Sequence, residues 1–537
     1  MHTYRYRELS VELHRKGKVR EALAKLLRLH PEKIFNLEVE RFALDSRRKG
    51  DPHWSYNVIF DVEVPLRATG NAARGLIEAT RERETLESDP LTGSVAMAGH
   101  VDVIGAGPAG LWAALHLLRR GFTVDLYEQG KPVEERFRDI RRFFAERVFN
   151  EHSNVLFGEG GAGAFSDGKL NTRSRNIYSE TVLRDMVEFG VDESVVTFAK
   201  PHIGTDRLVL MLRKIRAEIA RLGGKIHFDT TLEDIEIKDG RIVAIKMRDV
   251  SGVLPALNSA AHWEPCEALV LATGHSARGI YELLAARGVT LESKAFAMGV
   301  RVEHPQALID MRQLGKGVDT RLTGAAEYFL ATPTLGKTSS AYSFCMCPGG
   351  VLVPCASEPG TLATNGMSYS RRNGKTANGA IVVPVDASST TFGGLDFQRK
   401  TERDAFDVGG KNYAAPAQTI KAFLAHRADK NLPKSTYPCG LVPSNIWDWL
   451  DKKICSSLAE GFQNFDRKIP GFIEQGLIVA PETRTSSPLR ITRNNDTLES
   501  VNTKGLFVLG EGAGYSGGIV TSAADGVRLA VRAKKSK

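Results

Sequence analysis

The sequence predicts an α/β fold in which two similar units, one starting near residue 100 and one at the end of the chain, flank an inserted domain. Both units, at 100–130 and 505–533, contain an apolar strand, a glycine-rich turn and a helix in that order. The 537 residues suffice for three or four domains of about 150 residues. We therefore expect a small α/β module at 1–95, the first part of the main domain at 96–285, an inserted domain at 286–480, and a C-terminal part that completes the main domain at 481–537.

Composition excludes several classes of protein. With 42% hydrophobic and 25% charged residues, the chain is not disordered, collagen-like or coiled-coil. The first residues, MHTYRYRELS, lack the apolar stretch of a secretory leader, and the apolar runs are far shorter than the ~20 residues of a membrane span. Six cysteines in a chain of this length form no disulfide framework. We expect a cytoplasmic protein with no membrane association.

The N-terminal module is basic and has the pattern of a small α/β unit. Its first 50 residues hold 13 lysines and arginines against seven acids. Alternating residues predict strands at 4–11, 34–44 and 56–64, and one apolar face predicts a helix at 19–29. The polar stretch 83–98 is expected to be a linker. Such a basic unit binds nucleic acid or an acidic partner, or is simply a solvated surface; no stacking aromatic platform is evident, so we favour the last.

The first glycine turn matches the dinucleotide-binding fingerprint G-x-G-x-x-G at 105–110. An apolar strand precedes it, a helix follows it, and the next strand ends in Glu128. Gly105 allows the tight turn, Gly107 lets the backbone approach a pyrophosphate, and Gly110 lets helix and strand pack closely. The helix N-terminus offers free amides to the phosphates. A carboxylate at Glu128 accepts hydrogen bonds from the adenosine ribose and repels a 2′-phosphate, which disfavours NADP.

The far end of the chain distinguishes FAD from NAD. Apolar strands precede both Thr273-Gly274 and the turn 510–518, which enters a second helix at Ile519. A second glycine-lined helix start far from the first is what a long flavin cofactor would use, because its amides would face the ribityl chain and the N1/O2 edge of the ring. Glu511 would bond a ribityl hydroxyl. No second complete fingerprint is present, so a separate NAD(P)H domain is not expected.

Together these motifs resemble a widespread family of FAD-dependent dehydrogenases with one dinucleotide-binding fold and a family-specific C-terminal part. The resemblance runs from about residue 34 to 531 and rests on 105–110 with Glu128, and on 157–170, 201–206, 344–350, 482–488 and 510–519. It implies a glutathione-reductase-type FAD-binding Rossmann domain with an inserted substrate domain and a ferredoxin-like N-terminal module. One departure is Glu511, where an aspartate is more usual in flavoproteins.

In similar flavoproteins, a loop of small residues such as 158–170 passes the pyrophosphate and the ring. The cofactor-binding residues that we predict are Gly105, Gly107, Pro108, Ala109, Gly110, Glu128, Gln129, Gly161, Gly163, Ser166, Asp167, Gly168, Lys169, Leu170, Leu232, Thr273, Gly274, Gly510, Glu511, Gly517, Gly518 and Ile519. For Asp167 and Lys169 the alternatives are a turn cap and a solvated cation.

Five residues are weak catalytic candidates: Lys169, His202, His275, Cys345 and Cys347. Either histidine can exchange protons near neutral pH, although a lone histidine is more often structural. The two cysteines, two apart on a strand, are expected to face the same way. They are either redox-active or small buried apolar residues. With Cys355 they do not match zinc spacing, and no metal site is expected.

A polar segment at 484–490 precedes the C-terminal unit. Arg484, Thr485, Ser486 and Arg490 are expected either to bind an anionic substrate or the flavin edge, or to form a loop held by its own bonds. Overall we expect an FAD-dependent oxidoreductase that passes a hydride between a small molecule and flavin N5. The alternative is a flavoprotein whose basic N-terminal module binds nucleic acid or a protein partner.

Overall fold

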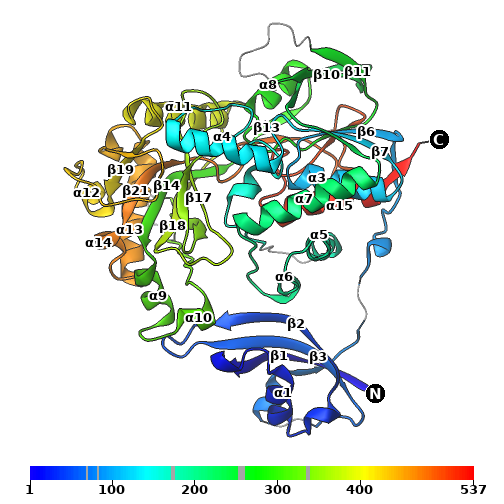
Figure 1. The fold of residues 1–537 in the computed structure, drawn as a ribbon, viewed down its shortest axis with the longest axis vertical. Helices are drawn as coiled ribbons and strands as arrows, with labels where there is room; N and C mark the ends of the chain where they lie inside the picture. Colours follow the sequence, from blue (N-terminus) through cyan, green and yellow to red (C-terminus); the bar gives the residue numbers. More distant parts are fainter. Residues whose placement is uncertain (68–69, 82–83, 171–175, 252–260, 334–338, 537) are drawn as a thin grey trace.

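The computed structural model describes residues 1–67, 70–81, 84–170, 176–251, 261–333 and 339–536. Residues 1–78 form the module at the bottom of Figure 1. Its elements are β1 (His2–Glu12), α1 (Val19–Leu27), β2 (Phe35–Asp45), β3 (His53–Val62), α2 (Asn71–Gly75) and β4 (Leu76–Glu78). The strands pair antiparallel in the order β2-β3-β1-β4. Alternation gives the sheet one apolar face, with Tyr4, Trp54 and Phe60 buried around Leu23 of α1.

The main domain is built on a five-stranded parallel sheet in the order β23-β12-β6-β7-β8. Its strands are β6 (His100–Ile104), β7 (Thr123–Tyr127), β8 (Lys225–His227), β12 (Leu269–Leu271) and β23 (Leu506–Val508). Strands from both ends of the main domain therefore lie in one sheet. The prediction of an α/β chain is confirmed.

Helices cover one face of this sheet: α3 (Pro108–Arg119), α5 (Ile177–Glu188), α7 (Thr205–Arg221) and α15 (Ile519–Arg532), which lie together in Figure 1. An antiparallel meander and α8 (Arg278–Ala286) pack on the other face. Its strands are β9 (Thr230–Lys238), β10 (Arg241–Asp249) and β11 (His262–Pro265). The carboxyl ends of β6, β12 and β23 thus open toward the rest of the molecule.

A six-stranded sheet in the order β15-β18-β14-β21-β19-β20 forms the core of the inserted part. Its strands are β14 (Phe296–Pro305), β15 (Tyr342–Cys347), β18 (Thr376–Val385), β19 (Ala415–Thr419), β20 (Leu441–Pro443) and β21 (Leu477–Glu482). The accompanying helices are α9 (Gln306–Leu314), α10 (Thr320–Thr323), α11 (Gly393–Val408), α12 (Ile420–Leu424), α13 (Lys452–Lys468) and α14 (Phe472–Gln475). Two further two-stranded sheets are formed by β16 (Val351–Pro354) with β17 (Thr364–Met367) and by β13 (Leu291–Ser293) with β22 (Leu489–Ile491).

The segment expected to be a linker contains a strand. β5 (Val95–Met97) pairs in parallel with β24 (Ala533–Lys535) at the C-terminus. The linker prediction was therefore wrong over these residues, because a partner more than 400 positions away leaves no local signal. The remaining helices are α4 (Val133–Glu146) and α6 (Ser194–Thr197).

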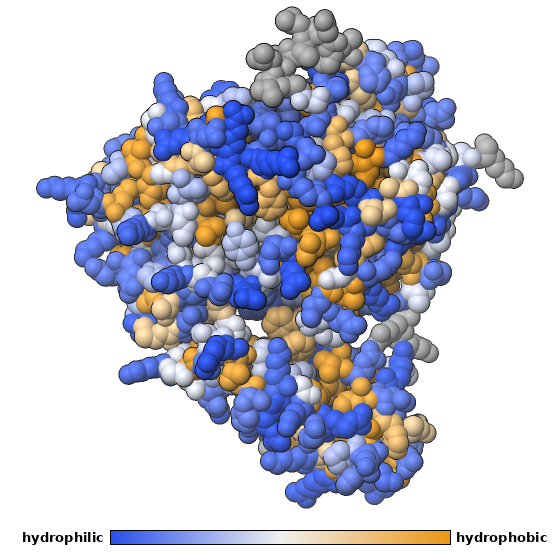
Figure 2. All heavy atoms as spheres, in the orientation of Figure 1, coloured by the Kyte–Doolittle hydropathy of each residue, from blue (hydrophilic) through white to orange (hydrophobic). Residues whose placement is uncertain are grey.

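The N-terminal module contacts the main body near α6 and near α9 and α10. The Ala199 amide donates to the Phe42 carbonyl (2.8 Å), and the ring centroids of Phe42 and Phe198 lie 4.9 Å apart. The Gly50 amide donates to the Leu314 carbonyl (2.7 Å). On the face drawn in Figure 2, hydrophilic side chains are spread over both the module and the body. Among the described residues, no helix has the length and apolar character needed to span a bilayer.

Candidate functional site

The three fingerprint glycines play different roles. Gly105 has φ +102°, and a Cβ there would lie 2.6 Å from the Ala272 carbonyl oxygen. A Cβ on Gly110 would lie 1.9 Å from the Gly105 carbonyl oxygen. At Gly107, the residue before α3, the nearest atom to a Cβ would be the Gly161 Cα at 3.9 Å. Packing therefore explains the first two glycines, whereas Gly107 borders open space at a helix N-terminus.

Glu128 ties three loops together at the end of β7. One carboxylate oxygen accepts from the Ala106 amide (2.8 Å), and the other from the amides of Gly130 (2.9 Å) and Gly158 (3.0 Å). The side chain is buried and Gln129 beside it is half-buried. The carboxylate thus holds the fingerprint turn against the loop that starts at Gly158, and its unused lone pairs are the acceptors offered to a ribose.

A buried arginine that the sequence analysis missed shapes this second loop. The guanidinium of Arg136, in α4, donates to backbone carbonyls of Asn154, Val155, Gly158, Glu159 and Gly161, at 2.7 to 3.2 Å. Burial lowers the pKa of Arg136 to about 9. The available signal was its spacing on the buried face of α4 with Val133, Ile140 and Phe143. Neutral acceptors around a buried cation fix the loop in one conformation.

The four glycine-bearing turns converge on one strip. A Cβ on Gly161 would lie 3.2 Å from Gly107 Cα, one on Gly163 3.1 Å from Ile519, one on Gly510 2.9 Å from Ala109, and one on Gly512 2.6 Å from the Gly274 carbonyl oxygen. These approaches join segments more than 400 residues apart in sequence. The strip runs along the carboxyl ends of β6, β12 and β23, where open parallel sheets bind nucleotides.

The strip has bare backbone where α15 begins. Gly518 precedes the helix with φ +103°, and both it and Gly517 are exposed. A Cβ on Gly274, Gly517 or Gly518 would meet no atom of the described residues within 4 Å. The Gly517 amide donates to Thr521 Oγ1 (3.2 Å), so what this 14-residue helix offers to an electron-rich group is open space and the positive end of its dipole. These positions fit a long dinucleotide cofactor.

Glu511 is the acidic side chain of this strip. Its Oε1 lies 3.9 Å from Nε2 of His275, and the carboxylate is 26% exposed. Burial raises the pKa of Glu511 to about 7, although Lys294 and the Gly518 amide oppose the shift. Burial also lowers the pKa of Lys294. The strip therefore places a carboxyl group with a raised pKa beside the open start of α15.

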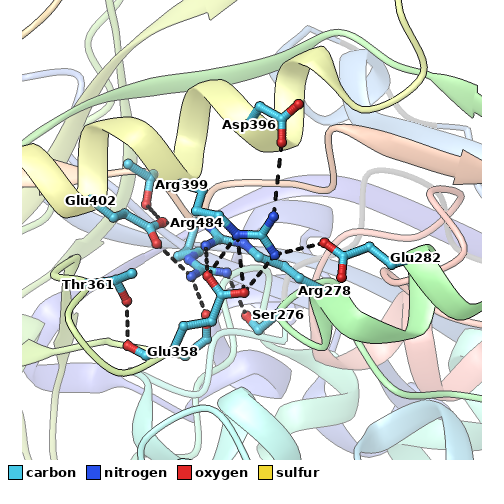
Figure 3. Close-up of polar contacts among 11 residues, drawn as sticks. Ser276, Arg278, Glu282, Glu358, Thr361, Asp396, Arg399, Glu402 and Arg484 are labelled. Atoms are coloured by element: carbon cyan, nitrogen blue, oxygen red, sulfur yellow. Dashed lines mark hydrogen bonds and ion pairs between the residues drawn. The ribbon is translucent and has the colours of Figure 1, made fainter.

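Behind the strip lies a closed ion-pair network, drawn in Figure 3. Arg278 and Arg484 both bind Glu402, at 2.9 Å each, and Arg278 also binds Glu358 (2.9 Å). Arg399 adds a second cation on Glu358 (2.7 Å). The guanidinium of Arg484 is buried, and its partners Glu402 and Ser357 come from other segments of the chain.

The other residues of that polar segment divide between the two alternatives. The Thr485 hydroxyl donates to the Ala297 carbonyl (2.6 Å), which is also an internal bond. Ser486 is half-buried, and the Arg490 guanidinium lies 5.0 Å from the Tyr515 ring centroid.

Burial, followed by the charges of Arg484 and Arg278, lowers the pKa of His275 to about 3. The network thus keeps His275 neutral.

A second polar cluster gathers several other candidates. Asp167 pairs with Arg372, with an Nε–Oδ1 distance of 2.9 Å, and Lys169 lies 3.8 Å from both Asp167 and Glu327. The Lys169 ammonium also donates to the Met346 carbonyl. Burial opposes ionisation of Asp167, but Arg372 outweighs it and lowers the pKa. Lys169 is therefore a paired, mostly buried cation rather than a solvated one.

His202 lies beside this cluster. It pairs with Lys169 through a backbone bridge, and its Nε2 lies 3.1 Å from the Ser370 carbonyl oxygen. Burial, followed by Arg372, lowers the pKa of His202. The loop itself is held internally: Ser166 Oγ donates to Gly163 and accepts from the Gly168 amide. Leu170 is buried next to His202's segment, its amide donating to Pro201 (2.9 Å).

The expectation that Cys345 and Cys347 face the same way was wrong. Strand β15 changes register against β18 between Phe344 and Cys347, and Cys345 has φ +42°. Cys345 is exposed, whereas Cys347 is buried 3.4 Å from a guanidinium nitrogen of Arg301. The bulge separates the two side chains, and burial raises the pKa of the Cys347 thiol.

Two groups lie apart from the strip. Leu232 is buried in the core under the meander with Tyr127. Within the described residues, His100, Asp102 and Asp125 bring ligand atoms within 4.8 Å of one another on β6 and β7, near the amino ends of these strands. His100 lies 3.2 Å from Asp102, and Lys225 lies 4.0 Å from Asp125, so both carboxylates have basic partners in the chain.

Comparison with known proteins agrees with this geometry. Residues 103–142 match the model of the NAD(P)-binding Rossmann-like domain, and residues 295–485 match that of the FAD-dependent protein, C-terminal domain-like. Over 517 residues, 95% of this chain and 94% of the relative, the sequence is 40% identical to an uncharacterized protein of Clostridium beijerinckii.

The solved structures that match the chain are more distant. L-proline dehydrogenase from P. horikoshii is 10% identical, with 81% of this chain and 93% of that chain covered and a TM-score of 0.36. A geranylgeranyl bacteriochlorophyll reductase-like protein from Thermoplasma acidophilum is 11% identical, with 81% and 77% covered and a TM-score of 0.35.

Proposed function

The chain belongs to the family of FAD-dependent oxidoreductases whose C-terminal domain it carries, with FAD as cofactor, and we propose that it passes a hydride between a small-molecule substrate and N5 of the flavin. The observation that carries this proposal is the strip of glycine backbones from four separate segments, which leaves open space beside the starts of α3 and α15. When bound, the flavin supplies the two-electron acceptor and donor chemistry.

The chain's own groups divide along the length of the cofactor. The amides of Gly107 and Ala109, on either side of the N–H-free Pro108, would bind the pyrophosphate, and Glu128 would bind the adenosine ribose. The start of α15, at Gly517, Gly518 and Ile519, would direct the positive end of its helix dipole at the N1/O2 edge of the ring, where negative charge develops on reduction. Two contacts support this order: Gly161 approaches Gly107, and Gly163 approaches Ile519, so both helix starts border one loop.

We assign the substrate side to the cluster around Lys169. Lys169 is flanked by Glu327 and Asp167. It also donates to the carbonyl of Met346, which lies between the exposed Cys345 and Cys347 at the end of β15. Because the two carboxylates fix the ammonium group of Lys169 in place, it can orient a polar substrate. In this proposal Lys169 and His202 are the groups most suited to contact the substrate. Cys345 and Cys347 are weaker candidates, because burial raises the pKa of both thiols and keeps them in the unreactive protonated form.

The N-terminal module contributes none of the residues assigned above. Its βαββαβ order and its strand order support a ferredoxin-like fold, and the inserted six-stranded sheet supports a glutathione-reductase-type arrangement. The sheet face away from α1 carries the ion pairs Arg5–Glu40 (2.6 Å) and Arg81–Asp61 (3.2 Å). These pairs favour a structural role for this face, and the other basic residues of the module leave binding of nucleic acid or an acidic partner as the alternative.

The test is anaerobic reduction of the FAD-bound full chain by a panel of small organic donors, followed at the flavin absorbance bands. At least one donor class should reduce the flavin within turnover time. Lys169→Met should slow that step about 100-fold while photoreduction stays unchanged, and Lys238→Met in the β9–β10 hairpin serves as the matched control. A fully occupied flavin that no donor reduces would contradict the hydride-transfer proposal.

A further inference from the structure

We propose that, above neutral pH, Glu511 takes up one proton from solvent when the flavin accepts two electrons, so that the protein balances the charge of the reduced ring. This inference rests on the flavin placement given under the proposed function. It assigns to Glu511 a role in addition to a ribityl hydrogen bond.

The position of Glu511 carries the argument. It lies in the turn between β23 and α15, directly after Gly510, which packs against Ala109 of α3. The Gly518 amide at the start of α15 faces its carboxylate. Because Gly517 and Gly518 leave open space beside them, a ring bound there lies within Coulomb range of this carboxylate.

Charged and titratable groups face Glu511 from each neighbouring element. His275, after β12, lies 3.9 Å away, and within the described chain its buried Nδ1 has no hydrogen-bond partner. Lys294, between β13 and β14, and Tyr281, on α8, both interact with the Glu511 charge. Arg490 of β22 acts on Lys294.

None of these neighbours neutralises Glu511 fully. His275 is kept uncharged by its burial and by the cations of the network in Figure 3, with its pKa at about 3. Tyr281 donates its hydroxyl to the Gly512 carbonyl (2.8 Å) and stays protonated, its pKa raised by burial. Lys294 is the remaining cation, and it is itself partly desolvated. The Glu511 carboxyl, with a pKa of about 7, is therefore the group that responds to a new charge.

The balance of charge is simple. A hydride brings two electrons and one proton to the oxidised ring and leaves it with one additional negative charge. That charge repels the Glu511 carboxylate, raises its pKa and draws one proton from solvent onto the carboxyl oxygen. On reoxidation the hydride leaves, the repulsion ends and the carboxyl releases its proton. The pH dependence follows. Below pH ~7, Glu511 is protonated with either the oxidised or the reduced flavin, so reduction causes no proton uptake there. Above pH ~7, the carboxylate is ionised in the oxidised state and takes up a proton on reduction.

The experiment measures the midpoint potential of the FAD-bound full chain from pH 5.5 to 9, for the natural sequence and for Glu511→Gln. The difference between the two curves should be flat below about pH 7. Above it, the potential of the natural protein should fall about 30 mV more per pH unit than that of the variant, since one proton per two electrons has this slope. Glu292→Gln, at an exposed position in β13, should follow the natural curve. A difference curve that stays flat over the whole range overturns the proposal.

Infrared spectroscopy provides a second test, for the case in which Glu511→Gln does not retain its flavin. The reduced-minus-oxidised infrared spectrum of the natural protein at pH 8 should gain a protonated-carboxyl band, and Glu511→Asp should shift that band. Absence of the band in the natural protein also overturns the proposal. Neither measurement uses a substrate, so failure here with normal reduction by donors leaves the proposed function standing. Correct proton coupling without reduction by any donor contradicts the proposed function alone.

Discussion

The two glycine-rich helix starts, before α3 and before α15, look alike in sequence but differ in structure. In the first turn, Gly105 and Gly110 press against protein, and Gly107 alone faces space. In the second turn the packed glycines come first: Gly510, Gly512 and Gly514 would each bring a Cβ within 2.9 Å of another atom. The bare glycines, Gly517 and Gly518, come last, at the helix start.

This difference separates two reasons for glycine. Some positions need it because another segment of the chain occupies the space of a side chain, and substitution there attacks the fold. Others, such as Gly107 and Gly517, have open space and no positive φ, and substitution there leaves the empty protein intact, whereas Gly518 also needs glycine for its φ of +103°. The two classes occur in a different order in the two motifs, so sequence spacing does not sort them, whereas the distances do.

Gly110→Ala should have the largest effect. Alanine normally stabilises a helix relative to glycine by up to about 1 kcal/mol. Here the new Cβ would lie 1.9 Å from the Gly105 carbonyl oxygen, which forces α3 away from β6. We expect a loss of about 3 kcal/mol or more in the free energy of unfolding, with or without FAD. Chemical denaturation checks it, and unchanged stability would show that the turn relaxes freely.

Gly107→Val should remove FAD and leave the fold. A Cβ there has only Gly161 Cα near it, at 3.9 Å, and the backbone of Gly107 is extended, so valine is accommodated in the empty protein. The branched side chain would occupy the pyrophosphate position and weaken FAD binding at least 100-fold, whereas stability without FAD should change by about 1 kcal/mol. Gly99→Val, equally open but outside the strip, is the control. A yellow, stoichiometric Gly107→Val protein would place the cofactor elsewhere.

Local patterns were sufficient for much of the fold. The fingerprint at 105–110 with Glu128 predicted the β6–α3–β7 unit, because neighbouring residues decide it. β5 was missed because its partner lies at the other end of the chain. The bulge at Cys345 was missed because it depends on the register between β15 and β18.

The site was predictable where backbone geometry defines it and less so where buried charges do. Nothing next to Arg136 in sequence states that it would bind five carbonyls, and Arg484 was as consistent with a ligand contact as with its buried pair to Glu402. Charge pairing between distant segments is decided by the assembled fold. The raised pKa of Glu511 has the same origin, since burial by several elements causes it.

The smallest effect is expected at the open end of the second turn, from Gly517→Asp compared with Gly517→Asn. Both side chains enter free space at an exposed position and have nearly the same size, so both proteins should fold with stability close to that of the natural chain. Only the aspartate adds a charge, at the helix start that we propose faces the reduced ring. A carboxylate there opposes the negative charge of that ring by about 1–3 kcal/mol. With two electrons this lowers the midpoint potential by about 20–60 mV relative to Gly517→Asn. Spectroelectrochemistry at pH 8 measures the pair side by side. Equal potentials in the two variants would mean that the start of α15 does not face the flavin, and would leave only the first turn as evidence for the cofactor's position.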